Sequence, residues 1–487
     1  MNTKALRQKV LDLAIHGKLV PQNPNDESAT VLLEKIRAEK AEKITKGELK
    51  ADKKDSFIFV GSDKRHYEQF ADGTVKDIED EIPFDIPEGW AWCRLPEITE
   101  YIFAGGDKPS VFSKEKTDEC FIPIYSNGIE NDGLYGFTDK ATAKETSLTI
   151  SARGTIGFTC IRTTAFVPII RLITITPNND YINIHYLKAV FDSLFSFSEG
   201  SSIPQLTVPT IKQFLIPLPP FNEQKNIYSS ITKIETIIQT LEQNKNDLKI
   251  SIKQTKSKIL DLAIHGKLVP QDPNDEPAEE LLKRIATSDN RPYKKLSGDE
   301  IPFELPKTWI WQKLPDLCSI PITDGTHKTP TYSDKENGIP FLSSKDVTSG
   351  EIDWSKIKYI TKELHEELYK RLAPQKNDIL LAKNGTTGIA ALVKDNTVFD
   401  IYVTLAIIRP ISKIIYPQYL LYIINSQFCK NQFNDYLTGI GVPNLHLVDI
   451  NKTVIPLPPL SEQQRIVLKI EELFKYTDII NINIKDC

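Results

Sequence analysis

Apolar residues recur three and four positions apart along a long, otherwise polar stretch in the middle of the chain. This spacing, with polar exceptions at Lys245 and Thr255, is typical of the seam of a coiled coil. It predicts one helix from Asn222 to His265, about 65 Å long at about 1.5 Å per residue. Gly266, which follows, suits a helix C-terminus. The predicted seam consists of Ile231, Ile234, Ile238, Leu241, Leu248, Ile252 and Ile259.

The two ends of the chain carry pieces of the same helix. Cys487 aligns with Leu248 and Met1 aligns with Ile250, so the two pieces together rebuild almost the whole central helix. We therefore expect an antiparallel pair, in which the continuous central helix packs against a helix assembled from both termini. The alternative is two unrelated amphipathic helices on separate domains. The terminal pieces would contribute Leu6, Val10, Ile470, Leu473, Thr477, Ile480 and Ile484 to the seam.

Three long segments of the chain occur twice in the same order, which indicates an internal repeat. The first pair is LDLAIHGKLVPQNPNDESA from Leu11 and LDLAIHGKLVPQDPNDEPA from Leu260. The second pair begins with EIPF, at Glu81 and Glu300. The third pair contains IPLPP, from Ile216 and Ile455. Between these shared frames the two halves differ greatly. One scaffold therefore carries two unlike domains.

The frames predict the domain organisation of the chain. The first half has extra residues before its EIPF segment, in a charge-rich stretch, and the second half has extra residues between EIPF and PLPP. We expect two α+β domains with helical segments between and around them. The predicted parts are an N-terminal helix and repeat segment (1–30), a charge-rich linker or insert (31–79), domain 1 (80–220), the central helix and repeat segment (221–278), a linker (279–299), domain 2 (300–459) and a C-terminal helix (460–487).

Composition changes this picture little. The net charge of −5 gives no support to nucleic-acid binding by itself, so any such contact must come from local patches. No apolar run approaches the ~20 residues that cross a bilayer, and we expect a cytoplasmic protein. The six cysteines are scattered without a CxxC pair. They favour buried, reduced thiols over a metal site or a disulfide framework.

Several motifs resemble a known family. DGTHKTPTYSDKENGIPFLSSKDVTSGEID from Asp324 and NDILLAKNGTTGIAALV from Asn377 are similar to the target-recognition pattern of type I restriction-modification specificity subunits. IPLPPLSEQQRIVLKIEELF from Ile455 resembles the junction of such a domain with its helix. In domain 1, LTISARGTIGFTCI from Leu148 matches the Gly-Thr segment, whereas the stretch from Gly105 departs from the DGTH pattern.

The resemblance implies an architecture and a function. The fold would be α+β, with two target-recognition domains separated by a pair of long antiparallel coiled-coil helices in a circular pseudo-twofold arrangement. The chain would read a bipartite, asymmetric target in double-stranded DNA and would have no catalytic or metal-binding residues. It would dock two methyltransferase (modification) subunits and a restriction/translocase subunit. The chain itself would bind no cofactor; S-adenosylmethionine, ATP and Mg would be bound by those partners.

Two alternatives stay open. The first is the specificity subunit of a type II-like system, whose partner fuses a methylase with a nuclease. The second is a stand-alone DNA methyltransferase. That enzyme needs an Asn/Asp-Pro-Pro-aromatic loop and a glycine-rich cofactor turn, and the PLPPF segment at Pro217 lacks the amide or carboxylate of such a loop.

Polar, turn-forming segments supply the candidate DNA contacts. The segment from Asp324 to Thr329 follows an apolar run, and the segments at Arg153 and Lys383 each join two strand-like runs, as hairpin tips do. Hydroxyls and basic groups beside glycine suit contact with phosphates or base edges. Plain turns that need glycine for a positive φ are the alternative. The predicted contacts are Lys108, Ser126, Asn127, Arg153, Gly154, Thr155, Thr326, His327, Lys328, Thr329, Ser343, Ser344, Lys345, Lys383, Asn384, Gly385, Thr386 and Thr387.

Four tryptophans follow the two EIPF frames. They could form a stacking platform for bases. Because both halves share this frame where DNA-reading residues should differ, we expect them instead to pack at the entrance of each domain. The residues are Trp90, Trp92, Trp309 and Trp311.

Overall fold

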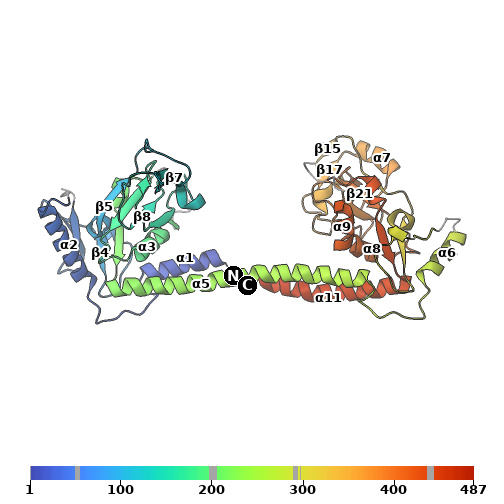
Figure 1. Ribbon diagram of the computed structural model, residues 1–487, viewed down its shortest axis with the longest axis horizontal. Helices are drawn as coiled ribbons and strands as arrows, with labels where there is room; N and C mark the ends of the chain where they lie inside the picture. The colour runs from blue at the N-terminus through green and yellow to red at the C-terminus, as the bar shows by residue number, and fades with distance from the viewer. Residues whose placement is uncertain are drawn as a thin grey trace. The chain divides into compact units, whose positions relative to one another are not determined.

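The computed structural model describes residues 2–49, 55–196, 206–288, 294–296, 298–435 and 444–486. The chain divides into two compact units, Met1–Asn244 and Lys245–Cys487 (Figure 1). Each has its own large hydrophobic core. Helix α5 (Phe221–Ile264) is continuous over 44 residues, so its first part belongs to unit 1 and its last part to unit 2. Among the described residues, no helix is long and apolar enough to cross a membrane.

Unit 1 is built around a four-stranded antiparallel sheet in the order β5-β11-β8-β9. Strands β8 and β11 are buried along their whole length, and helix α3 packs on β8 and β9. Its elements are the helices α1 (Thr3–Ile15), α2 (Ala29–Thr45), α3 (Ile184–Ser196) and α4 (Val208–Lys212), and the strands β1 (Ser56–Val60), β2 (His66–Phe70), β3 (Val75–Asp77), β4 (Ala91–Arg94), β5 (Thr99–Ala104), β6 (Ile122–Tyr125), β7 (Leu134–Thr138), β8 (Ser147–Ile150), β9 (Thr159–Arg162), β10 (Val167–Pro168), β11 (Ile173–Pro177) and β12 (Leu215–Leu218).

Unit 2 repeats this plan with the sheet order β14-β21-β18-β19. In both units a second sheet contains one parallel pair, β6 with β10 and β16 with β20. Its elements are the helices α6 (Ala278–Ser288), α7 (Lys362–Arg371), α8 (Pro417–Ile424), α9 (Gln427–Asp435), α10 (Leu447–Ile450) and α11 (Leu460–Asp486), and the strands β13 (Ile310–Lys313), β14 (Thr323–Asp324), β15 (Tyr332–Ser333), β16 (Ile339–Leu342), β17 (Lys358–Ile360), β18 (Ile379–Ala382), β19 (Ala390–Leu392), β20 (Asp400–Ile401), β21 (Leu405–Ile408) and β22 (Val454–Leu457).

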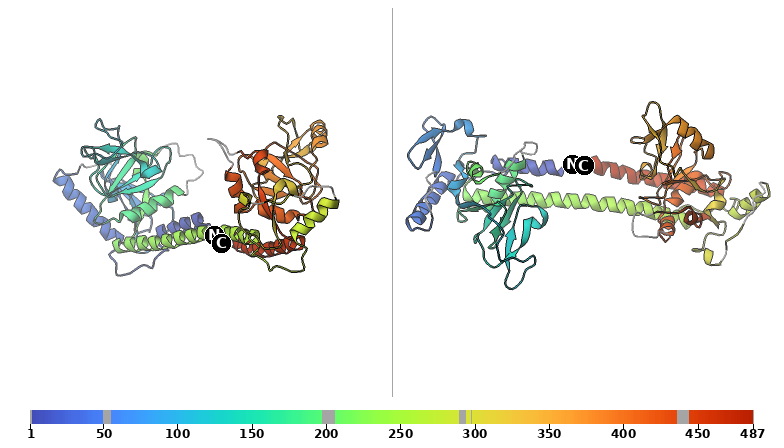
Figure 2. Two further views of the ribbon diagram at one scale, coloured as in Figure 1. Left: turned by 45° about the vertical axis from the view of Figure 1, so that its right-hand side comes forward. Right: turned by 90° about the horizontal axis from the view of Figure 1, so that it is seen from above.

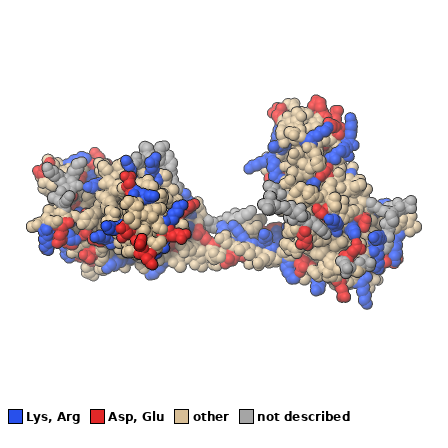
Figure 3. Space-filling model, turned by 45° about the horizontal axis from the view of Figure 1, so that its top comes forward, with Lys and Arg blue, Asp and Glu red and all other residues tan. Residues whose placement is uncertain are grey.

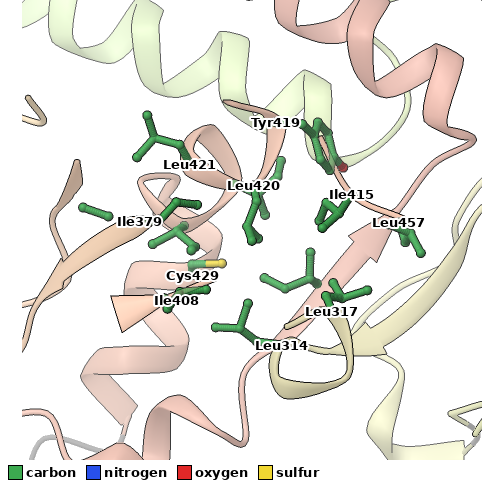
Figure 4. Close-up of a cluster of buried hydrophobic side chains, with 14 of the residues drawn as sticks. Leu314, Leu317, Ile379, Ile408, Ile415, Tyr419, Leu420, Leu421, Cys429 and Leu457 are labelled. Atoms are coloured by element: carbon green, nitrogen blue, oxygen red, sulfur yellow. The ribbon is translucent and has the colours of Figure 1, made fainter. Parts of the chain in front are cut away.

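The core of unit 2 forms where helix α8 covers the central sheet. Figure 4 shows Leu420 and Leu421 of α8 near Ile379 of β18 and Ile408 of β21, with Cys429 of α9 among them. All five residues are buried. The run YLLYII is almost wholly apolar, as expected for a helix enclosed on most sides. This packing fixes the sheet that carries the loops described below.

The repeated frames close each domain by pairing its beginning with its end. Strand β4 pairs with β12, and β13 pairs with β22, both antiparallel. The indole nitrogen of Trp90 donates to Glu223 at 3.0 Å, and that of Trp309 donates to Glu462 at 2.9 Å. The prediction that the frame tryptophans pack at the domain entrances is confirmed: all four are buried, namely Trp90, Trp92, Trp309 and Trp311.

Within each unit, a terminal helix lies beside α5 (Figures 1 and 2). In unit 1, the guanidinium of Arg7 on α1 contacts Glu235 at 2.8 Å and Glu242 at 2.9 Å. In unit 2, Lys256 of α5 contacts Asp478 of α11 at 2.5 Å. Both pairs are antiparallel. In unit 1, Gln22 follows Arg7 in the chain, but its partner Glu223 precedes Glu235. In unit 2, Arg465 precedes Asp478, but its partner Asp275 follows Lys256.

The predicted seam residues differ in burial. Nearer the domains they are buried or half-buried, whereas Leu241, Leu248 and Ile480 are each more than two-fifths exposed. The side chain of Ile484 lies outside the described residues. The buried members are Val10, Ile238, Ile259, Ile470 and Thr477, and the half-buried members are Leu6, Ile231, Ile234, Ile252 and Leu473.

In the stretch 31–79, expected to be a charge-rich linker or insert, the described residues (31–49 and 55–79) are folded. They contain most of α2 and the antiparallel sheet β1-β2-β3. Arg94 of β4 donates to Glu68 of β2 at 2.9 Å, which fastens this sheet to domain 1. The short strands were not predicted because they contain many charged residues. Several of these residues form ion pairs in the folded sheet. The expected linker 279–299 likewise contains most of α6.

Candidate nucleic-acid interface

In domain 2, loops from four strand ends meet beside the start of β21. The backbone N–H of Lys383 donates to the carbonyl of Thr404 at 2.8 Å, and the N–H of Ser344 donates to the Thr404 hydroxyl at 3.0 Å. The N–H of Val403 donates to the carbonyl of Thr326 at 3.0 Å. We call these loops the domain 2 platform; it consists of 325–329, 343–345, 383–388 and 402–404. Every predicted contact residue of domain 2 therefore lies in one place.

Lys383 points into the protein at this platform. Its ammonium forms an ion pair with the carboxylate of Asp324, and both side chains are less than a tenth exposed. Asp324 also lies 3.3 Å from the Nε2 atom of His327, whose side chain is largely exposed. The pair fastens the loop after β14 to the hairpin between β18 and β19. In this structure Lys383 is an anchor, and its contact with phosphate stays a prediction.

The other predicted residues of domain 2 divide into structural and exposed groups. Thr326 is buried, and its hydroxyl accepts from the N–H of Lys328 at 3.1 Å. Ser343 and Asp346 form a capping box: the Ser343 hydroxyl accepts from the N–H of Asp346, and the Asp346 carboxylate accepts from the N–H of Ser343. Lys328 is exposed and reaches Glu367 at 2.5 Å. Exposed or half-exposed at the surface are also Thr329, Ser344, Lys345, Asn384, Gly385, Thr386 and Thr387.

Domain 1 has an equivalent platform, although its sequence departs from the DGTH pattern. Gly106 forms a parallel bridge with Ile169, as Thr326 does with Tyr402. A Cβ atom on Gly105 would lie 2.5 Å from the carbonyl carbon of Pro168, so glycine is required by this close approach. When the two domains are aligned by these bridges, Lys108 of domain 1 corresponds to Lys328 of domain 2. The domain 1 platform consists of 105–108, 126–128, 152–157 and 169–172.

Asn127 ties the domain 1 platform together. Its side-chain oxygen accepts from the N–H of Ala152 at 2.8 Å, and its amide nitrogen donates to the carbonyl of Ile170 at 2.6 Å. Both functional ends of this predicted DNA contact are therefore engaged within the protein. The neighbouring Ser126 is half-buried, and its N–H donates to the carbonyl of Gly133 at 2.8 Å.

The Gly-Thr hairpins of the two domains have the same geometry. Gly154 and Gly157 have φ of 75° and 86°, and Gly385 and Gly388 have φ of 77° and 76°. A positive φ accounts for these glycines without a ligand. Equivalent hydrogen bonds show that Ala152 of domain 1 corresponds to Lys383 of domain 2. The exposed Arg153 therefore corresponds to Asn384 and not to the lysine.

Sequence reasoning missed two residues of the domain 1 platform. Ile170 and Arg171 form a turn between β10 and β11, with φ of 53° and 61°, and both side chains are exposed. The segment VPIIRLITI reads as one continuous apolar strand, because it lacks the glycine or asparagine that normally marks such a turn. Only the backbone conformation identifies them.

Each unit has both basic and acidic side chains on its surface. On the face shown in Figure 3, basic and acidic side chains alternate over both units. Burial raises the pKa of Asp400, which precedes the domain 2 turn, and a hydrogen bond from the His365 ring at 2.7 Å opposes that rise. Among the described residues, no three His, Cys, Asp or Glu side chains gather as metal ligands would.

Comparisons with known proteins agree with this architecture. The family model "Type I restriction modification DNA specificity domain" matches residues 87–249 and 306–486. The chain is 28% identical to the type I restriction enzyme EcoAI specificity subunit of Escherichia coli, covering 99% of this chain and 90% of that protein. It is 27% identical to the EcoEI specificity subunit of the same species, covering 98% and 89%.

A solved structure described as the complex assembly and conformational transition of the type I R-M system shares the fold. The TM-score is 0.54 at 18% identity, over 83% of this chain and 95% of that one. The family model itself matches well over half of the chain, once in each unit. The chain therefore belongs to the family of type I restriction modification DNA specificity proteins, with two copies of the specificity domain.

Proposed function

We propose that this chain reads a bipartite, asymmetric DNA target, with one half-site read by each domain, and that it catalyses no reaction itself. The observation that carries this proposal is the repeated platform. Both domains bring four loops together in the same register, yet the side chains at equivalent positions differ: Arg153 against Asn384 and Arg171 against Thr404 are two examples. Equal frames with unequal surfaces are what two different half-sites require.

The helices would set the separation of the half-sites. Helix α5 continues from one unit into the other, and it is antiparallel to α1 in unit 1 and to α11 in unit 2. We infer a coiled-coil pair with pseudo-twofold symmetry, in which α5 lies against a helix made from both chain ends. The number of unread base pairs would then follow from helix length at about 3.4 Å per base pair.

The same helices would dock the partner subunits. The relatives are named as specificity subunits of type I restriction enzymes, which supports a complex with partner subunits. We infer that these are two methyltransferase subunits and a restriction/translocase subunit. Those partners would supply S-adenosylmethionine, ATP and Mg, and the complex would act in the cytoplasm. The exposed seam residues Leu241, Leu248 and Ile480 suit such contacts.

A domain exchange tests the proposal. Residues 300–459 are replaced by the corresponding domain of another specificity subunit, and the methylated sequence is mapped in cells that carry the chain with its partner subunits. One half of the target should change while the other half and the spacer stay the same. If both halves change together, the domains do not read DNA separately and the proposal is wrong.

A second test addresses the helix. Four residues inserted at Lys245, close to one helical turn, should lengthen the unread spacer in an active complex. An active complex with an unchanged spacer would show that α5 does not set the distance.

A further inference from the structure

The turn at Ile170 and Arg171 is a strained surface feature of domain 1. These are two consecutive non-glycine residues with φ in the left-handed region. The N–H of Leu172 donates to the carbonyl of Ile169 at 3.1 Å, which closes a tight turn. Such turns normally contain Asn-Gly, and a β-branched residue with positive φ is rare. Glycine here would form the same turn without strain.

Several contacts hold the turn in place. The N–H of Ile170 donates to the carbonyl of Gly106 at 2.8 Å, and the N–H of Arg171 donates to the carbonyl of Gly105 at 2.9 Å. The carbonyl of Ile170 accepts from Asn127, which also binds the start of the Gly-Thr hairpin. Within the described residues, neither side chain of this turn belongs to the main hydrophobic core of domain 1 or to the small cluster around Ile169.

Both side chains are free to meet a ligand. Ile170 is 49% exposed. Arg171 is exposed, and within the described part of the chain no acidic side chain forms an ion pair with it. Strain of this kind persists where the surrounding structure enforces it, and it is concentrated at functional sites. Because glycine would allow the same turn, the feature that these two residues add is their pair of exposed side chains.

The same turn in domain 2 is built differently. The N–H of Leu405 donates to the carbonyl of Tyr402 at 2.9 Å, so Val403 and Thr404 occupy the equivalent positions. Neither has a positive φ, both are half-buried, and the Thr404 hydroxyl is used by the N–H of Ser344. The protruding form of the turn is particular to domain 1, as expected of a feature that distinguishes one half-site from the other.

We propose that this turn reads bases in the half-site of domain 1, with Arg171 binding a guanine edge in the major groove and Ile170 contacting the methyl group of a neighbouring thymine. The inference rests on the proposed function. The planar guanidinium presents two parallel donors to the O6 and N7 atoms of guanine. An apolar side chain recognises the thymine methyl group. A phosphate contact would need neither an isoleucine nor a fixed fork.

Five variants of the full chain, Arg171→Ala among them, are each assembled with the methyltransferase partners and test the proposal by selection from duplex DNA randomised over both half-sites. Arg171→Lys keeps the charge and loses the fork, and it should relax one guanine position by roughly tenfold. Ile170→Gly relieves the strain, so it should weaken the preference for one thymine while the melting temperature does not fall. The matched controls lie on the hairpin between β1 and β2, where Lys64 also has a positive φ of 67°. Lys64→Gly and Arg65→Lys should leave every base preference unchanged.

The outcomes separate this inference from the proposed function. If the wild-type complex selects both half-sites but Arg171→Lys and Ile170→Gly leave the domain 1 consensus unchanged, the turn does not read bases. If Arg171→Ala weakens binding to all sequences equally, Arg171 is a phosphate contact and the inference is overturned. A wild-type complex that selects no second half-site would contradict the proposed function instead.

Discussion

Domain 1 and domain 2 fasten the same platform with different chemistry. Domain 2 uses the buried ion pair between Lys383 and Asp324. At the equivalent positions domain 1 has Ala152 and Ala104, and the amide of Asn127 bridges the loops instead. The loops have the same backbone geometry in both domains, whereas the side-chain contacts that join them differ. A scaffold of this kind lets the surface residues vary without moving the loops that carry them.

The largest difference should come from breaking the ion pair of domain 2. Lys383→Met leaves the carboxylate of Asp324 buried without its partner, which costs about 3–5 kcal/mol of unfolding free energy. Urea unfolding monitored by tryptophan fluorescence would measure the loss. The double variant with Asp324→Leu should recover most of it, because two apolar groups need no partner. A single variant as stable as the wild-type protein would show that the pair does not hold the platform.

Unit 1 should lose stability with rising pH because of one buried carboxyl group, Glu97. Burial raises the pKa of Glu97 to about 8, with opposing contributions from Arg37 and Lys40, and neither carboxylate oxygen has a hydrogen-bond partner. The folded state therefore binds a proton more tightly than the unfolded state. Unit 1 should lose stability as pH rises from about 4.5 to about 8, by up to a few kcal/mol.

The equivalent residue in unit 2, Asp316, is exposed and provides the internal comparison. Glu97→Gln should remove most of this decline from the unit 1 melting transition, and Asp316→Asn should leave the pH dependence of unit 2 unaltered. Differential scanning calorimetry between pH 5 and pH 9 measures both. A decline that persists in Glu97→Gln would assign the effect to another group.

A smaller effect is expected from the tie of domain 1. Asn127→Ala leaves the N–H of Ala152 and the carbonyl of Ile170 without partners, which costs about 1–3 kcal/mol. Asn127→Asp keeps the acceptor for Ala152 and loses only the donor to Ile170, so it should cost less. Selection from randomised DNA should show a weakened domain 1 half-site and an intact domain 2 half-site. Equal weakening of both would contradict a local role for Asn127.

The sequence predicted the repeat, the two domains and the long central helix, because these depend on periodicity and on duplicated segments. The candidate loops that it named lie together on one platform in each domain, and their contact with DNA stays a prediction. It could not show that Lys383 points inward, since that depends on Asp324, which lies 59 residues earlier in the chain. Nor could it identify Ile170 and Arg171, because an apolar run that makes a strained turn has the same composition as a strand.

The inserted sheet shows a second limit of sequence reasoning. Charges in the stretch 31–79 indicate a solvated linker when each residue is read alone. In the folded protein Glu68 is buried against Arg94, which also contacts Glu81 at 2.6 Å. Pairing across distant segments turns a polar sequence into a folded element. Such pairs are visible only in three dimensions.

The smallest expected effects concern Lys108 and Lys328, which occupy equivalent exposed positions of the two platforms. Lys108 lies 4.2 Å from the centre of the Phe112 ring, and Lys328 reaches Glu367. Neither contact is buried, so replacing either lysine by glutamine should change stability by less than about 1 kcal/mol. If both contact phosphates, each substitution should weaken binding to all sequences alike and reduce the slope of log affinity against log salt by about one. A substitution that instead alters the preference for one base would make that lysine a base contact. The two platforms would then differ in which loop reads the sequence as well as in how their loops are fastened.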